Sequence, residues 1–398
     1  MSILSFSPIS LANITIGLPI QSPTFTELVA PLESILTMVE PLVSGCNREI
    51  TFDFESQLKC LIYYHIEGHT SAKALLEEIQ DNQSIKEIIL PETELGESTF
   101  YEANSHRGAT QMLEVFSILS KKVSKRLRTD HAQLGKLVAI DGSLIDATLS
   151  MTWAEYRDSS NKAKVHVGFD LNHSIPRKLY LTEGKGAERP YVNAILEADE
   201  TGVLDRGFQD HALFDKWIDD GKHFVARLKS NTKWEELERL PFKKGGKIFF
   251  FAKILLGDDN HRMLHPVYLV GYRVGNKIYW VATDRADLTA EEIAFIYLLR
   301  WEIEQFFCWW KRQLKVYHLI SRSSHGMLLQ LLSGLVTYLL FILYCYERYG
   351  ETKPSISRLR SLRRLIRQEI GCNIYLVNMQ FNMDLDDFLL LFFINAIF

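Results

Sequence analysis

The sequence predicts a mixed α/β protein in which a sheet is interrupted by a β-rich insertion and flanked by helical segments. Short runs of β-branched and aromatic residues lie between about residues 136 and 286, and apolar residues at helical spacing dominate on either side. The order of the runs is the third observation. Strands that first follow one another and then alternate with helices are typical of a mixed sheet.

Residues 1–133 are predicted to form a helical domain. Apolar residues recur at helical spacing in FTELVAPLESILTMVEPLV and in FESQLKCLIYYHIEG, and Thr70 or Ser71 can cap the helix that follows. The domain ends in SKKVSKRLR, which places five positive charges between Lys121 and Arg128. A solvated helix end and a contact with DNA explain this basic edge equally well.

Residues 134–230 are predicted to form the first part of the sheet. A short helix, HALFDKWIDD, precedes the last strand of this part, and Gly221 is placed to end that helix. The strand-like runs lie at 136–146, 163–171, 176–184, 200–208 and 223–229.

Residues 231–286 are predicted to be a β insertion with basic decoration. IFFFAKILL, HPVYLVGYRV and KIYWVATD have the composition of strands, and the last two are joined through Gly275 and Asn276, a good two-residue hairpin. Nine Lys or Arg residues against three Glu residues lie between 222 and 253. Because the whole chain carries a net charge of −4, any contact with nucleic acid must come from such local clusters.

Residues 287–348 are predicted to complete the core with long helices. Thr289-Ala290-Glu291-Glu292 is a capping box that starts the first of them. The segment from His325 to Tyr346 contains no charged residue and is long enough to cross a bilayer. We favour a buried central helix, because Gln330, Ser333 and Gly334 interrupt the apolar run and a polar helix lies just before it.

Four polar side chains on the first of these helices have an unusual spacing. Tyr297, Arg300, Glu304 and Lys311 fall on one narrow stripe of an uninterrupted α-helix. A phenol, a guanidinium, a carboxylate and an ammonium group are not what a helix normally buries. The stripe suits a metal ligand flanked by groups that bind phosphate.

Two aspartates follow predicted strands at points where ligand sites form in open α/β sheets. Asp141 lies in AIDGS and Asp205 in LDRGF. Taken singly, each is more often a turn residue, and Glu304 is more often part of a solvated helix face. Three converging carboxylates repel one another unless divalent ions neutralise them, so together they indicate a two-metal site for phosphodiester chemistry.

The segment YLLRWEIEQFFCWWK fits the Y-x2-R-x3-E-x6-K signature and thereby resembles bacterial DDE transposases of the insertion-sequence-4 type. AIDGS and LDRGF are similar to the contexts of that family's first and second aspartates, and a β insertion before the glutamate is a mark of the same group. The resemblance covers about residues 134–348. It implies a ribonuclease-H-like core that cuts and rejoins DNA.

The resemblance also implies roles for single residues. Asp141, Asp205 and Glu304 would be catalytic ligands of two Mg²⁺ ions, for which Mn²⁺ can substitute. Tyr297, Arg300 and Lys311 would hold phosphates of the cleaved strand. Weaker candidates for DNA contacts, chosen for their places at the ends of strands, are Arg206, Arg227 and Lys229.

In this family a nicked end attacks the opposite strand to form a hairpin, which requires a flipped base stacked on an aromatic residue. Here Tyr279 and Trp280 are adjacent in the strand before the long helix, and successive strand residues face opposite ways. One is therefore expected to stack the base while the other belongs to the core. The larger ring slightly favours Trp280 for the stacking role.

The implied partners are double-stranded DNA, as terminal inverted repeats and as target, and a second copy of the chain in the DNA complex. The implied location is the bacterial cytoplasm, at the nucleoid when bound to DNA, with no membrane. Residues 1–133 would bind the DNA ends. The basic region 349–398, with arginines in PSISRLRSLRRLIRQE, either contacts DNA, forms the dimer or packs on its own domain.

Three other interpretations compete with an active transposase. The first is a catalytically silent DNA-binding remnant, which the three carboxylates argue against. The second is a membrane protein anchored through 325–346. The third is another nuclease of ribonuclease-H fold, in which the stripe from Tyr297 to Lys311 and the β insertion would not be expected.

Overall fold

The computed structural model describes residues 23–43, 50–90, 94–147, 150–157, 160–186, 189–243, 246–314 and 318–382. Parts of the predicted N-terminal, insertion and C-terminal regions, including 1–22, 244–245 and 383–398, lie outside this description. The described α-helices are α1 Pro23–Val29, α2 Glu33–Leu36, α3 Phe54–Glu67, α4 Ala72–Asp81, α5 Gln83–Ile89, α6 Glu97–His106, α7 Ala109–Arg126, α8 Arg189–Ile195, α9 His211–Asp219, α10 Ala290–Leu299, α11 Trp301–Gln313, α12 Ser324–Tyr349 and α13 Ile356–Asn382.

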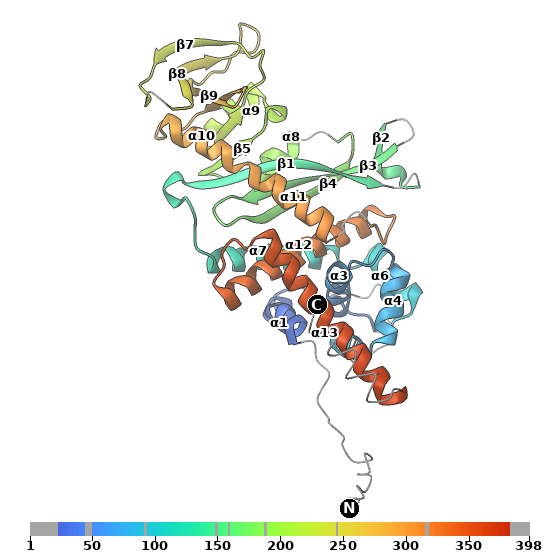
Figure 1. The fold of residues 1–398 in the computed structure, drawn as a ribbon. Helices are drawn as coiled ribbons and strands as arrows, with labels where there is room; N and C mark the ends of the chain where they lie inside the picture. Colours follow the sequence, from blue (N-terminus) through green and yellow to red (C-terminus); the bar gives the residue numbers. More distant parts are fainter. Residues whose placement is uncertain are drawn as a thin grey trace, which may run out of the picture.

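The described strands belong to one mixed sheet (Figure 1). They are β1 Lys136–Ala147, β2 Glu155–Arg157, β3 Ser160–Asp170, β4 Ile175–Glu183, β5 Glu200–Leu204, β6 His223–Arg227, β7 Trp234–Arg239, β8 Ile248–Leu256, β9 Val267–Val274 and β10 Lys277–Thr283. Their order is β2-β3-β1-β5-β6-β10-β9-β8-β7, with β4 also paired to β3. The prediction of a mixed α/β protein is confirmed.

Strand β1 is the pivot of the sheet because it pairs in both senses. It runs antiparallel to β3 and parallel to β5, and β5 in turn runs parallel to β6. The predicted fourth and fifth strands end earlier than expected, at Leu204 and Arg227. A 3₁₀ turn, Arg206–Phe208, replaces the end of the fourth strand.

The strands of the predicted insertion extend the core sheet. β10 pairs antiparallel with β6, and β9, β8 and β7 follow in antiparallel order. The predicted hairpin is confirmed: Val274 pairs with Lys277, and Gly275 adopts a positive φ of 56° that its missing side chain permits. The edge strand β7 was not predicted, since its charged and largely exposed side chains show no alternation.

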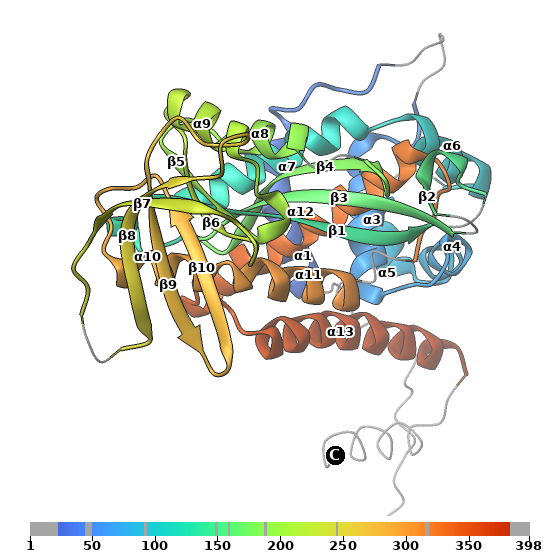
Figure 2. The ribbon, with the colours of Figure 1, turned by 90° about the horizontal axis from the view of Figure 1, so that it is seen from above.

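The two faces of the sheet have separate hydrophobic cores. Val138 and Ile140 of β1 pack on the side covered by α8 and α9. The alternate residues Leu137 and Ala139 join the larger core that contains α7, α10, α11 and α12. Figure 2 shows α11 beneath the strands on the side opposite α8 and α9. This alternation determines which side chains of β1 can meet α11.

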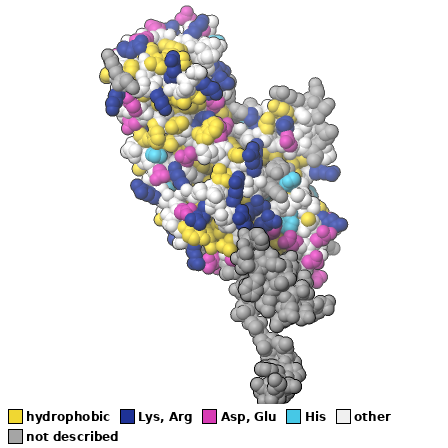
Figure 3. Space-filling model, in the orientation of Figure 1, with side chains coloured by type: hydrophobic (Ala, Val, Ile, Leu, Met, Phe, Trp, Pro, Cys, Tyr) yellow, Lys and Arg dark blue, Asp and Glu magenta, His cyan; other side chains and the backbone are white. Residues whose placement is uncertain are grey.

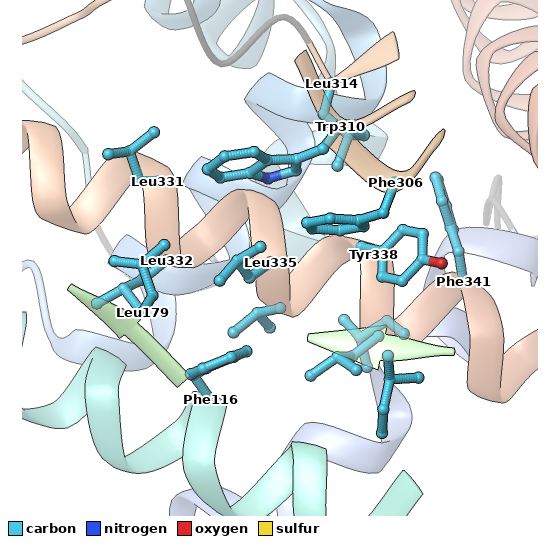
Figure 4. Close-up of a cluster of buried hydrophobic side chains, with 14 of the residues drawn as sticks. Phe116, Leu179, Phe306, Trp310, Leu314, Leu331, Leu332, Leu335, Tyr338 and Phe341 are labelled. Carbon is cyan, nitrogen blue, oxygen red and sulfur yellow. The ribbon is translucent and has the colours of Figure 1, made fainter. Parts of the chain in front are cut away.

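Among the described residues, α12 is the one helix that is long and apolar enough to cross a membrane by length and composition, yet 94% of its most apolar window is buried inside the protein. Figure 4 shows Leu331, Leu335 and Tyr338 of α12 between the aromatic side chains of α11 and Phe116 of α7. Phe306 of α11 meets Tyr338 edge-on with ring centroids 5.1 Å apart. The prediction of a buried central helix is confirmed.

The N-terminal helices share this core across the predicted boundary at residue 133. α7, α3 and α6 all pack on α12. Ser71 caps α4 by accepting the Ala74 N–H, and Asp53 caps α3 in the same way. These helices therefore support the catalytic half of the chain directly.

His65 of α3 ties the two halves together in the interior. Its Nδ1 lies 2.8 Å from the Leu314 carbonyl at the end of α11, and its Nε2 lies 2.9 Å from the Gln330 carbonyl of α12. Burial lowers the pKa of His65 to about 4, although the two carbonyls act in the opposite direction. The imidazole is therefore neutral in the folded protein at neutral pH.

This buried histidine predicts loss of stability in acid. The free energy of unfolding should be fully retained above the ordinary pKa of 6.5 and should fall as the pH drops towards 4, because only the unfolded chain then binds the proton. The fall of the His65 pKa from 6.5 to about 4 corresponds to roughly 3 kcal/mol in the free energy of unfolding. Urea unfolding across this pH range should show a shallower dependence for His65→Gln than for the wild type.

A matched control is His261→Gln, whose side chain is 83% exposed. That variant should follow the wild-type dependence. Equal slopes for His65→Gln and the wild type would rule out this role for His65.

Candidate active site

Asp141 and Asp205 are brought together by the pairing of β1 with β5. The parallel register ends with Ile140 opposite Leu204. Asp141 and Asp205 are the residues that directly follow these two in the sequence. Each continues the alternation of Ala139 and Val203, which face the core containing α10 and α11. Both carboxylates therefore stand at the carboxyl end of the parallel strands, below the catalytic helix.

Asp141 is the more confined of the two. It lies within β1, opposite Val167 of β3, rather than at the strand's end as predicted. Burial, together with the smaller effects of the Glu304 and Asp205 charges, raises the pKa of its carboxyl to about 6. The Gly142 N–H, 2.8 Å away, and Arg300 oppose that rise. The three carboxylates therefore influence one another across a common space.

Asp205 is held by a phenol and a guanidinium. The Tyr297 hydroxyl donates to Asp205 Oδ1 at 2.9 Å, and Arg227 lies 3.7 Å from the same oxygen. Although burial raises the pKa of Asp205, the Arg206 N–H, Tyr297 and Arg300 bring it below its usual value. Burial also raises the pKa of Tyr297 to about 12, so the phenol remains a hydrogen-bond donor.

The predicted single helix is interrupted at Arg300. The capping box is confirmed, since Thr289 and Glu292 cap α10 reciprocally. At the other end of α10, the Arg300 N–H bonds to Tyr297 O and the Ile303 N–H to Arg300 O, both across three residues. The uninterrupted stripe is therefore wrong. The stripe is divided between the end of α10 and the whole of α11.

Arg300 links the two helices at this break. Its guanidinium forms an ion pair with Glu304 one turn later, and it lies 5.6 Å from the centre of the Tyr297 ring. The Arg300 side chain is largely buried, and its Nε has no hydrogen-bond partner. An incompletely satisfied, buried guanidinium beside the carboxylates is well suited to receive an anion.

Lys311 lies apart from this group. Its Nζ donates to the Leu144 carbonyl of β1 at 2.7 Å, and burial lowers the pKa of its ammonium group. In this conformation Lys311 holds the C-terminal half of α11 against β1. A phosphate contact would require this hydrogen bond to be exchanged or shared.

The two aromatic residues of β10 face opposite sides of the sheet, as predicted. Their positions are the reverse of those that the sequence favoured. Tyr279 lies on the active-site face, where the Arg227 guanidinium sits 4.7 Å above its ring and Tyr297 lies 6.3 Å away. Trp280 faces the other core and packs against Trp234 and Phe250. The geometry therefore favours Tyr279 rather than Trp280 as the available ring.

A cleft of about 920 Å³ opens beside these residues, between α10 and α11 on one side and β8–β10 on the other. Asp205, Arg227, Tyr297, Arg300 and Glu304 line it. So do Lys243, Lys247, Tyr272, Phe295 and Trp301, which were not among the predicted site residues. The excess of basic residues between 222 and 253 was the sequence signal for the two lysines.

Two weaker candidates lie outside the cleft. Arg206 follows Asp205 but its side chain is exposed. Lys229 is exposed beyond β6, where its N–H donates to Gln209 Oε1 at 2.8 Å. Neither lines the cleft, so any contact with a substrate would occur on the surrounding surface.

Residues 133–340, more than half of the chain, match the family described as the transposase DDE domain. This chain belongs to the DDE transposase family. The matched range contains both aspartates, the helix break and Glu304, so family and geometry concern the same part of the molecule.

Two similar proteins are named as transposases for insertion sequence elements. The putative transposase for insertion sequence element IS4SA of Synechocystis sp. is 26% identical over 69% of this chain and 79% of its own length. The probable transposase for element IS5377 of Geobacillus stearothermophilus is 24% identical over 65% of this chain and 70% of its own. A synaptic complex of piggyBac transposase with hairpin DNA aligns with 92% of this chain and 81% of that chain, at 13% identity and a TM-score of 0.41, too low for any argument.

The carboxylates of this transposase fit a divalent ion only in part. Asp141 and Asp205 are adjacent, and the raised pKa of Asp141 marks a carboxylate that a cation would stabilise. Glu304 is instead paired with Arg300. Among the described residues, no group of three or more His, Cys, Asp or Glu side chains is gathered closely enough to hold a metal ion.

The raised pKa of Asp141 predicts that this residue weakens the fold. The folded protein is most stable when Asp141 is protonated. The free energy of unfolding therefore falls as the pH rises from the ordinary carboxyl pKa of 3.8 towards about 6. Asp141→Asn should therefore raise the free energy of unfolding at neutral pH by on the order of 2 kcal/mol. Urea unfolding without divalent ions measures this.

Asp146→Asn on the same strand is the control, because the Asp146 side chain is 82% exposed and its pairing with Lys162 contributes little. It should leave stability nearly unchanged. A less stable Asp141→Asn protein would contradict the assignment.

Proposed function

We propose that this protein is a transposase of the insertion-sequence-4 type that moves its element by metal-dependent cut-and-paste transposition. Its β4-β3-β1-β5-β6 region would be a ribonuclease-H-like core, and its substrates would be the terminal inverted repeats and the target DNA. A homodimer would hold the paired ends in the bacterial cytoplasm. The observation that carries the proposal is the adjacency of Asp141 and Asp205 beneath Tyr297, Arg300 and Glu304.

In the proposed reaction, Asp141, Asp205 and Glu304 hold the divalent ions. When bound, Mg²⁺ or Mn²⁺ activates the attacking oxygen and stabilises the leaving oxygen of an in-line displacement at phosphorus. The residues of the chain position the strand. Lys243, Lys247 and Arg227 give the cleft wall the positive charge that a phosphate backbone requires.

Arg300 is proposed to exchange partners when the substrate enters. A phosphodiester in the cleft offers the guanidinium two oxygens and can replace the Glu304 carboxylate in that pairing. Glu304 would then be free to turn towards the two aspartates. This exchange accounts for a third carboxylate that stands near the pair but is engaged elsewhere in the DNA-free protein.

Hairpin formation is proposed to use Tyr279. The attack of the freed 3′-hydroxyl on the opposite strand forms one phosphodiester bond and breaks another, and it requires a base to leave the stack. Tyr279 presents its ring on the cleft, beside Arg227 and Tyr297. Trp280 is committed to the opposite core.

Loss of any one carboxylate should abolish DNA cleavage. Plasmid carrying the element's ends, incubated with the protein and Mg²⁺ or Mn²⁺, should yield excision or hairpin products with the wild type. Asp141→Ala, Asp205→Ala and Glu304→Ala should each reduce product formation by at least about 10³-fold, since two-metal chemistry tolerates no missing ligand. Gel analysis of cleaved plasmid measures this.

Glu302→Ala on the same helix is the matched control, because Glu302 pairs with Ser174 and Lys353 rather than lining the cleft. It should remain active. End binding should persist in all four variants, and cleavage by Glu304→Ala would refute the assignment of that residue.

The two aromatic residues on β10 should behave differently. Tyr279→Leu should leave the first nick intact but lower hairpin formation roughly tenfold or more, because base stacking on an aromatic ring contributes about 1–3 kcal/mol. Tyr279→Phe should restore it. Trp280→Phe should keep the wild-type ratio of hairpin to nicked product on denaturing gels, and a ratio that depended on Trp280 instead would favour the opposite assignment.

A further inference from the structure

A second positively charged pocket lies away from the carboxylates. It has a volume of about 470 Å³ and lies where α13 packs on α3, with Glu78 of α4 and Gln313 at the end of α11 also lining it. Its polar lining comprises Glu67, Glu78, Gln313, Arg360, Arg363, Arg364, Arg367 and Gln368. We call it the arginine pocket.

The four arginines of the arginine pocket recur at the spacing of one helical stripe of α13. Arg363 and Arg367 attach this helix to α3 through the Ile66 carbonyl and the Glu67 carboxylate. A neighbouring stripe, Leu359, Leu362, Ile366 and Ile370, is buried against the body of the protein. The helix therefore packs on its own domain through its leucines and isoleucines, and it presents arginines beside them; its contact with DNA stays a prediction.

The carboxylates of the pocket are already engaged. Glu67 accepts from Arg367 Nε at 2.9 Å. Glu78 accepts from the Tyr63 hydroxyl and lies 3.2 Å from His69. Among the described residues, neither Arg360 nor Arg364 has a carboxylate within salt-bridge distance, and both side chains are exposed.

Arg363 is half-buried beside the other guanidiniums. Its Nε donates to the Ile66 carbonyl. Burial and the nearby charge of Arg367 together lower the pKa of Arg363 to about 10, although the Glu67 carboxylate opposes this change. An anion in the pocket would oppose it further.

The pocket is within reach of a duplex that also occupies the active site. Gln313 ends α11, the helix that carries Glu304. From Glu304 to Gln313 the helix rises by roughly 14 Å, or about four base-pair steps of B-DNA. Figure 2 shows α11 and α13 on the same side of the sheet, and the pocket lining places Gln313 at the end of α11 close to the arginines of α13. Figure 3 shows several Lys and Arg side chains on the face of the molecule drawn in Figure 1.

We propose that the arginine pocket binds the phosphate backbone of duplex DNA, flanking the strand held in the active-site cleft. The proposal rests on the proposed function, because it takes DNA as the substrate. From Arg360 to Arg367 the helix rises roughly 10 Å, which matches about three base-pair steps. The contact reads no base sequence, since guanidiniums on phosphates set position and affinity.

The test is the salt dependence of DNA binding by the full chain. The probe is a fluorescently labelled duplex of arbitrary sequence, and affinity is measured by anisotropy over a series of NaCl concentrations. The double variant Arg360→Gln, Arg364→Gln should reduce the slope of log affinity against log salt by about 1.8, or 0.9 for each lost phosphate contact. Both side chains are exposed, so the variant should fold as the wild type does in thermal unfolding.

The matched control removes two exposed charges elsewhere, with Lys216→Gln on α9 and Arg348→Gln at the end of α12. It should keep the wild-type slope. Equal slopes for wild type and the arginine variant would overturn the proposal. So would a pocket that only binds inorganic phosphate, seen as phosphate-dependent thermal stabilisation lost in the arginine variant without any change in DNA binding.

The outcome is separable from that of the proposed function. A wild type that binds duplex DNA with the steeper slope but cuts no plasmid would support the arginine pocket while refuting transposase activity. A protein that cuts DNA normally but has equal slopes would leave the proposed function intact and refute the pocket.

Discussion

The parallel register between β1 and β5 fixes the position of everything else in the cleft. Asp141 and Asp205 are neighbours only because Ile140 lies opposite Leu204. A slip of one residue would turn the second carboxylate towards the core under α8 and α9, since strand side chains alternate between faces. Arg227 on β6 follows the same register through Val203 and Val225, so one alignment of three strands places two carboxylates and a guanidinium on the same side.

The catalytic helices in turn depend on α12. Phe306 and Trp310 of α11 pack over Tyr338 and Leu335, as Figure 4 shows, and Lys311 attaches the same helix to the backbone of β1. The packing of α11 on α12 and the Lys311 hydrogen bond to β1 therefore hold Glu304 at a fixed distance from the sheet. The break between α10 and α11 lies at Arg300, the residue that contacts both Tyr297 and Glu304.

Local patterns in the sequence accounted for much of the fold and of the site. The capping box, the buried α12 and the association of Asp141 and Asp205 with strands follow from runs of a few residues, although Asp141 lies within β1 rather than at its end. The break at Arg300 was missed because residues 289–315 contain no Gly or Pro. The choice between Tyr279 and Trp280 depends on pairing between β6 and β10, and the engagement of Lys311 depends on β1, so neither could be read from local spacing.

The buried α12 also constrains how the chain is made. It is as apolar as a membrane span, and a newly synthesised segment of that kind is prone to aggregate or enter a bilayer. Helices α3, α6 and α7, which cover it, all precede it in the chain. Translation therefore completes the covering surface before α12 emerges. The N-terminal helices are therefore available to cover α12 as soon as it is synthesised.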